Sequence, residues 1–156
     1  MTYALTITVD LPFPAALETT REVLGASGFG VISDIDLLSA FSDKLGRAAA
    51  SGLGDYRILG ACNPHLARKA LNSEPEVGLL LPCNVVVRRA PGATSTTVQA
   101  FDPTVISDLS GATAATEVAT DATARLQAAL DLICVPAHSG GRPGSAGQND
   151  VSSARS

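Results

Sequence analysis

The sequence predicts an α+β fold, a two-layer domain in which a mixed sheet of about five strands packs against helices. Residues 3–9 and 96–101 alternate between apolar and polar side chains with the period of a half-buried strand. Residues 118–133 place their apolar side chains along one stripe of a long helix. A turn at residues 90–92 joins the last two strands as a hairpin, which favours α+β over α/β.

The first half of the chain predicts two strands and two helices. After the strand at residues 3–9, Leu17, Thr20 and Leu24 recur at helical spacing before glycine stop signals. Residues 29–35 predict a second strand, joined to the first by a crossover because a helix separates them.

A short amphipathic helix is expected after the second strand. Asp36 is a good N-cap, apolar side chains recur at residues 38, 41 and 45, and Gly46 suits the residue that ends a helix. The small residues at 47–55 predict a loop.

The second half completes the order βαβαβαββα. Residues 56–61 predict the third strand and residues 77–87 the fourth, and Pro82 inside the latter implies an edge, a bulge or a bend, because proline cannot donate to a sheet. Between them, Asn63 and Pro64 suit the start of a helix that ends near residue 72. A short helical turn at residues 105–109 and the long helix follow.

Composition narrows the class of protein. The 156 residues suit one domain at residues 1–135, with a core of aliphatic side chains because aromatic residues make up only 4% of the chain. The net charge of −4 and the scattered basic residues argue against nucleic acid as a partner.

The chain shows neither a signal peptide nor an apolar run that spans a membrane, so a cytoplasmic protein with reduced cysteines is expected. Residues 136–156 are dense in Gly, Ser and Pro and predict a disordered tail.

Two cysteines are the candidates for chemistry. If the helix at residues 64–72 is a right-handed crossover, the third and fourth strands run parallel, and Cys62 and Cys83 approach the Cα separation of a disulfide, roughly 4.4 to 6.8 Å. Cys62 precedes the N-cap, where the helix dipole favours a thiolate. Three readings stay open: a shared thiol or ligand site, a disulfide, and two small apolar core residues. Cys134 is assigned to the apolar stripe of the long helix.

Neighbouring residues extend the candidate site. His65 forms Cys-x-x-His with Cys62, and Cys83 adds a third soft or borderline ligand, a set that suits zinc with one open position; the alternative is an exposed histidine at a helix N-terminus. An asparagine follows each cysteine, either to orient a polar ligand or as N-cap and bulge residue. The candidate ligand-binding set is Cys62, Asn63, Pro82, Cys83 and Asn84.

Several strong catalytic motifs are absent from the sequence. It contains no GxGxxG after a strand, no GxxxxGK[ST], no HExxH and no GxSxG. Nucleotide cofactors and serine hydrolysis therefore have no support, and no cofactor is indicated.

The segments YRILGACNPHLARKAL and EPEVGLLLPCNVVVRR, with GFGVISDIDL upstream and Asp102-Pro103 downstream, resemble domain-of-unknown-function family 302. The resemblance covers residues 5–133. It implies a small α+β domain that forms homodimers and has no established activity. Its motif positions are Gly60, Cys62, Asn63, Pro64, Pro82 and Cys83, and His65 lies outside the pattern.

Three functions remain as hypotheses. The first is a non-enzymatic binding module that holds a small ligand or a soft metal ion at the cysteine and asparagine residues. The second is a thiol enzyme, with Cys62 as nucleophile or redox centre and Cys83 as its resolving partner. The third is a structural or interaction domain whose cysteines serve only in packing.

Overall fold

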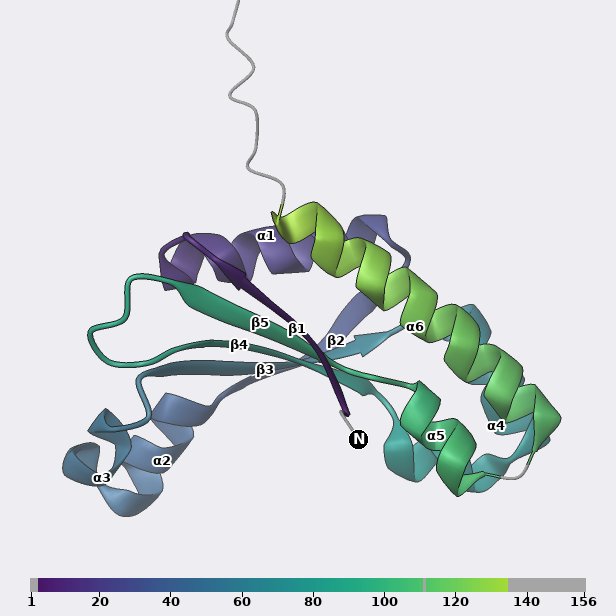
Figure 1. Ribbon diagram of the computed structural model, residues 1–156. Coiled ribbons are helices and arrows are strands. Elements are labelled where there is room, and N and C mark those ends of the chain that lie inside the picture. Colours follow the sequence, from purple (N-terminus) through teal and green to yellow (C-terminus); the bar gives the residue numbers. More distant parts are fainter. Residues whose placement is uncertain (1–2, 111, 135–156) are drawn as a thin grey trace, which may run out of the picture.

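The computed structural model describes residues 3–110 and 112–134 and contains one five-stranded sheet in the order β1-β5-β4-β3-β2. Helices α1 and α6 lie on one face, α2 and α3 lie at one end of the sheet, and α4 and α5 lie at the other (Figure 1). The strands are β1 (Ala4–Val9), β2 (Gly30–Asp36), β3 (Asp55–Cys62), β4 (Cys83–Arg89) and β5 (Thr96–Phe101). The helices are α1 (Phe13–Ala26), α2 (Leu37–Leu45), α3 (Arg47–Ser51), α4 (Pro64–Ser73), α5 (Thr104–Leu109) and α6 (Thr113–Cys134), with a 3₁₀ helix, η1 (Pro75–Leu80), before β4.

The core lies between the sheet and the helices α1 and α6. Because side chains alternate along a strand, every second residue of β5 from Thr96 to Ala100 is buried on the side of these helices, as are Cys83, Val85 and Val87 of β4 and Leu59 and Ala61 of β3. Aliphatic side chains fill the space, as expected for a chain with few aromatic residues. The main contributors are Leu24, Leu59, Val85, Val87, Val98, Leu126 and Leu130.

The structure confirms the α+β class and several local predictions. β4 and β5 form the expected antiparallel hairpin. β1 and β2 are joined through α1 and lie at opposite edges of the sheet, so their connection is a crossover and not a tight hairpin. Asp36 caps α2 by accepting a hydrogen bond from Ser39 N at 2.9 Å, and Gly46 ends that helix with a φ of 86°.

The prediction of a mixed sheet with parallel third and fourth strands was wrong. All four strand pairs are antiparallel, including β3 with β4. The reason is that α4 and η1 remain at the end of the sheet where β3 finishes, with α4 packed on α6, so β4 starts beside the end of β3 and runs back along it. A connection with helices can thus act as a long hairpin.

Three further local predictions need correction. The expected fourth strand begins only at Cys83, because residues 75–80 form a 3₁₀ helix. The expected loop at residues 47–55 contains the short helix α3. Cys134 is exposed at the end of α6, whereas Ile133 beside it enters the core, since adjacent helix residues point about 100° apart. The tail predicted at residues 136–156 lies outside the described residues.

Candidate functional site

The start of α4 is built as predicted, with Asn63 as its N-cap. The Oδ1 atom of Asn63 accepts hydrogen bonds from His65 N and Leu66 N, both at 3.2 Å. Pro64 occupies the first turn, where its missing N–H costs nothing. The side-chain oxygen of Asn63 is therefore engaged with its own helix.

Beside this helix start lies a small apolar cavity at the end of the sheet where β3 finishes and β4 begins. Its volume is about 40 Å³, and residues of α4, α5, α6 and the 3₁₀ helix η1 contribute to its walls. Apart from Cys62, Asn63 and Cys83, its walls are hydrocarbon. They comprise Phe29, Ala61, Leu66, Ala67, Ala70, Val77, Leu81, Pro103, Ile106, Ala115, Val118, Ala119 and Ala122.

Both cysteines line this cavity, and neither forms a disulfide. Cys62 ends β3 and Cys83 begins β4, with Ala61 directly opposite Cys83 in the antiparallel register. Both cysteines therefore lie at one end of the sheet, and the antiparallel pairing of β3 with β4 places them there, not a crossover.

Cys83 is a neutral thiol at physiological pH. Its side chain is 7% exposed. Burial disfavours the charged thiolate, and the nearby charge of Cys62 adds to this, so the pKa of Cys83 rises to about 11. Cys83 therefore enters any reaction as a thiol that must first lose its proton.

Pro82 and Asn84, by contrast, lie away from the cavity. Asn84 pairs with Gly60 and points to the face of the sheet opposite α1 and α6, hereafter the open face. There it borders a shallow hollow with Tyr3, Tyr56, Val86, Gln99 and Phe101. Pro82, which follows a cis peptide bond, sits against Gly60, just before an interior strand and at no sheet edge. Of the three alternatives for Pro82, an edge, a bulge or a bend, the structure shows a bend.

The three-ligand metal set is also not assembled. His65 is exposed on the first turn of α4. Across residues 3–110 and 112–134, no group of three or more His, Cys, Asp or Glu side chains is placed to hold a metal ion. The two cysteines share the cavity without His65.

Sequence reasoning missed the alanine wall of the cavity. Ala115, Ala119 and Ala122 lie on one side of α6 and are all buried. Their spacing of four and three residues places them on one helix face, and their small side chains leave the space that larger residues would fill. An alanine stripe in an otherwise leucine-rich helix face was the available signal.

Asp102, near the same end, has a structural role. Its Oδ1 atom accepts hydrogen bonds from Thr104 N at 3.0 Å, Thr104 Oγ1 at 2.7 Å and Thr123 Oγ1 at 2.9 Å. Burial pulls the pKa of Asp102 upward, but these hydrogen bonds outweigh it and lower the pKa. The carboxylate thereby fastens the start of α5 to α6.

Comparison with known proteins places the chain in a family. The model of a family described as "Domain of unknown function DUF302" matches residues 5–133. The chain belongs to the DUF302 family. A solved DUF302 structure, described as an uncharacterized conserved protein from Bacillus stearothermophilus, is 30% identical. It aligns with a TM-score of 0.73 over 86% of this chain and 100% of its own. No curated protein matches.

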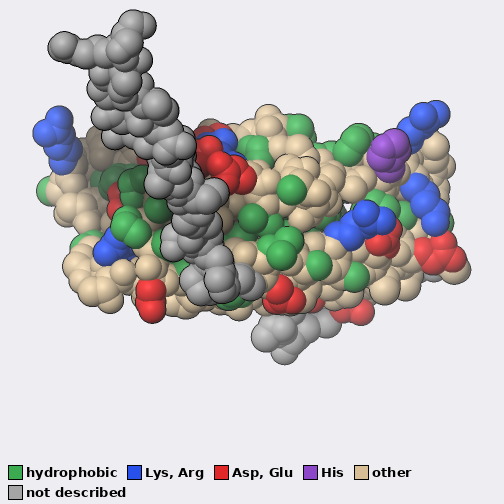
Figure 2. Space-filling view, turned by 90° about the horizontal axis from the view of Figure 1, so that it is seen from above, with side chains coloured by type: hydrophobic (Ala, Val, Ile, Leu, Met, Phe, Trp, Pro, Cys, Tyr) green, Lys and Arg blue, Asp and Glu red, His purple; other side chains and the backbone are tan. Residues whose placement is uncertain are grey.

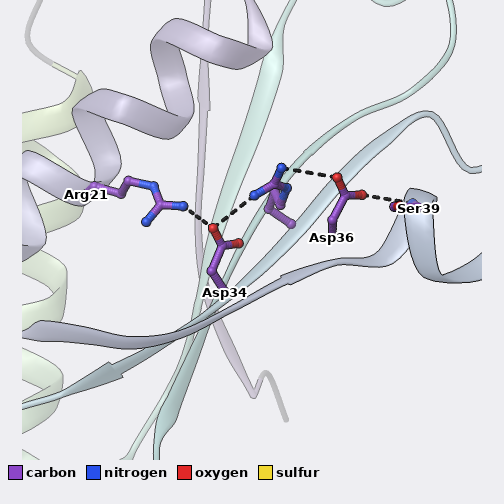
Figure 3. Close-up of polar contacts among 5 residues, drawn as sticks. Arg21, Asp34, Asp36 and Ser39 are labelled. Atoms are coloured by element: carbon purple, nitrogen blue, oxygen red, sulfur yellow. Dashed lines mark hydrogen bonds and ion pairs between the residues drawn. The ribbon is translucent and has the colours of Figure 1, made fainter.

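One cluster of charged groups of this DUF302 domain lies at the β2 edge of the sheet. Arg21 of α1 and Arg57 of β3 both bind Asp34 of β2, and Arg57 also reaches Asp36 at 3.1 Å (Figure 3). Elsewhere on the face that carries α1 and α6, acidic and basic side chains are interspersed with hydrophobic ones (Figure 2). In the described part of the DUF302 chain, no helix has the length and apolar character needed to cross a bilayer.

Proposed function

We propose that this DUF302 protein is a small-molecule binding module whose ligand is uncharged, mainly apolar and enters the cavity beside Cys62 and Cys83. The observation that carries the proposal is a small, partly open cavity walled almost entirely by hydrocarbon. Its three free cysteines fit a reducing compartment such as the cytoplasm, where we propose that it acts.

The chemistry of the walls defines the class of ligand. A charged ligand would need a partner inside the cavity, but the Asn63 oxygen is occupied by its helix and Cys83 is a neutral thiol. Water is also a poor occupant, because a buried water needs two to four polar partners. An apolar ligand gives up no hydrogen bonds to water when it enters such a site, so the walls favour an apolar ligand over a charged or polar one.

Xenon is a suitable first probe because it is small, uncharged and binds dry cavities. Methyl NMR spectra of the full chain under xenon pressure are expected to show shifts at Val77, Leu81 and Val118. The variant Ala119→Leu fills the cavity and should abolish these shifts. The matched control Ala128→Leu lies on the exposed side of the same helix and should leave them unchanged. Absent shifts in the unmodified protein, or equal shifts in both variants, would contradict the proposal.

A thiol function is the second candidate, and the shared cavity of Cys62 and Cys83 is the observation that favours it. Oxidised glutathione would accept the two electrons and two protons of the pair as a Cys62–Cys83 disulfide forms, and two glutathione molecules would leave. Two thiols are also the ligands that a soft metal ion prefers.

Thiol titration separates this candidate from apolar binding. With glutathione disulfide, mass spectrometry should find the loss of two hydrogens in a Cys134→Ser variant, whose remaining cysteines are Cys62 and Cys83. The Cys62→Ser/Cys134→Ser variant should show no such loss. If native Cys83 reacts only after global unfolding and no metal copurifies, the cysteines are packing residues and this candidate fails. The homodimer that the resemblance implies stays a prediction here.

A further inference from the structure

Residues 63–82, hereafter the α4 segment, leave the sheet and return to it at one place. β3 ends at Cys62 and β4 begins at Cys83, and Ala61 lies opposite Cys83 in the antiparallel register. Between these strand ends the chain forms α4 and η1. Within the described residues, no backbone hydrogen bond joins residues 64–81 to another part of the chain. The segment can therefore move as a unit without breaking a strand pair.

The α4 segment is only lightly packed on the rest of the molecule. Ala70 and Val77 are its only buried residues. They pack with Ile106 of α5 and Ala119 of α6 in a small apolar cluster that is separate from the main core. The cavity lies beneath the segment, and residues of α4 and η1 contribute to its walls. A helix above an empty space lacks the dispersion contacts that a filled space would supply, so this part of the fold is the least stabilised by packing.

Two side-chain contacts fasten the α4 segment to its neighbours. Lys69 Nζ lies 3.0 Å from Glu117 Oε2 of α6, and both side chains are more than half exposed. The Glu74 carboxylate accepts a hydrogen bond from Ser110 Oγ just after α5. Both contacts join the segment to the helices beside it at this end of the sheet (Figure 1). Because exposed ion pairs contribute little to stability, these contacts oppose opening only weakly.

The size of the cavity requires one of its walls to move. Its volume of about 40 Å³ is far below the roughly 150 Å³ of a cavity that binds benzene. The sheet and α6 belong to the main core, which leaves the α4 segment as the wall that can move. We infer that the α4 segment is a lid that swings away from α6 and admits an apolar ligand about the size of one aromatic ring. This inference rests on the apolar binding site proposed above and gives that site an entrance and a ligand size.

Cys83 reports the opening without any ligand. In a Cys62→Ser/Cys134→Ser background it is the only cysteine, and because it is 7% exposed, iodoacetamide reaches it only when the lid opens. Lys69→Glu places like charges across the contact between α4 and α6. This change should raise the rate of Cys83 modification about two- to fivefold, the size expected for an exposed pair. The swapped variant Lys69→Glu/Glu117→Lys should restore the original rate.

Arg125→Glu is the matched control for the charge reversal. Arg125 pairs with Asp121 at 2.8 Å within α6, so this pair joins no two elements and the modification rate should not change. Hydrogen exchange separates lid opening from global unfolding. The amides of α4 should exchange faster than those of β4 and depend less on urea, because less surface becomes exposed. Exchange of α4 at the rate of β4, or a Cys83 rate that Lys69→Glu leaves unchanged, would overturn the lid.

Benzene tests the ligand size in the full chain. It should shift the methyl NMR signals of Val77, Leu81 and Val118, and Lys69→Glu should speed its entry by the same factor as Cys83 modification. Absent benzene shifts in a protein that binds xenon would overturn the assigned ligand size. Xenon is small enough to enter without the lid and so separates the two proposals. Xenon shifts without opening of α4 would overturn the lid alone, whereas opening without xenon shifts would contradict the binding site alone.

Discussion

Gly60 of β3 leaves no room for a side chain on the open face of the sheet. A Cβ atom placed on it would lie 2.1 Å from Ser33 Oγ and 2.8 Å from Pro82 Cγ. Ser33 comes from the neighbouring strand β2, and Pro82 comes from the bend before β4. The space that a side chain would need at residue 60 is already filled from two sides, so a side chain there would overpack the sheet.

Gly60→Ala should therefore destabilise the protein. The Ser33 side chain can turn away but the Pro82 ring cannot, so we expect a loss of about 1–3 kcal/mol, the usual cost of overpacking. Urea denaturation measures it. Gly30→Ala in β2 is the matched control, since its new Cβ would meet only Cys62 O at 3.8 Å. A Gly60→Ala variant as stable as the control would show that the Pro82 bend yields easily.

At the scale of elements, ion pairs fasten α1 to the edge of the sheet. Arg21 of α1 and Arg57 of β3 converge on Asp34 of β2, with Arg57 Nη1 at 2.9 Å from the Asp34 carboxylate (Figure 3). Burial raises the pKa of Asp34, but the hydrogen bonds and charges of Arg57 and Arg21 outweigh it and lower the pKa. Two guanidinium groups on one carboxylate form a network, which is worth more than an isolated surface pair.

This network should make the free energy of unfolding depend on pH in the acidic range. Because the folded pKa of Asp34 is depressed, its contribution is complete above the unfolded value of about 3.9 and is lost as the pH falls through the folded pKa. Asp34→Asn should cost about 1 kcal/mol at neutral pH, and the difference from the unmodified protein should shrink as the pH falls below the unfolded value and through the depressed folded pKa of Asp34. Urea midpoints across this range measure it. Asp43→Asn, an exposed α2 carboxylate, should show no comparable loss; a pH-independent Asp34→Asn effect would contradict the network.

At the scale of the whole molecule, α6 connects separate parts of the fold. It packs against α1, α4, α5 and β1. Its buried side contributes leucines to the core over the middle of the sheet and alanines to the cavity at the end. One helix therefore holds the two layers together and shapes the candidate site. Its packing changes from large to small side chains along its length, and the cavity lies at the small end.

A pair of leucines on α6 tests this account. Leu130 is 1% exposed and Leu132 is 58% exposed. Leu130→Ala should lower the free energy of unfolding by about 2–5 kcal/mol, whereas Leu132→Ala should change it by less than about 0.5 kcal/mol. Thermal or urea unfolding of the two variants gives both values. Similar losses in both variants would mean that the exposed side of α6 is covered in solution.

Much of the local structure could be predicted because it depends on near neighbours in the chain. Asn63, Asp36 and Gly46 mark helix ends through contacts within a few residues. The alternation of apolar and polar residues in β1 and β5 arises because one face of each strand is buried. This pattern would be the same whichever strands lay beside them, so it can be recognised from the sequence alone. The short helix α3 and the 3₁₀ helix η1 were missed because they span only five and six residues, too few for helical periodicity to be recognised in the sequence.

The sequence by itself determined the α+β class, the main strands and helices, and the stretch around Cys62 and Cys83 as the unusual part of the chain. Only the tertiary structure decided that β3 and β4 are antiparallel, that both cysteines share one cavity, and that Asn84 lies on the other face. Strand direction depends on where α4 packs, which involves α6 some fifty residues later. The face that a strand residue occupies depends on register, and a shift of one residue reverses it.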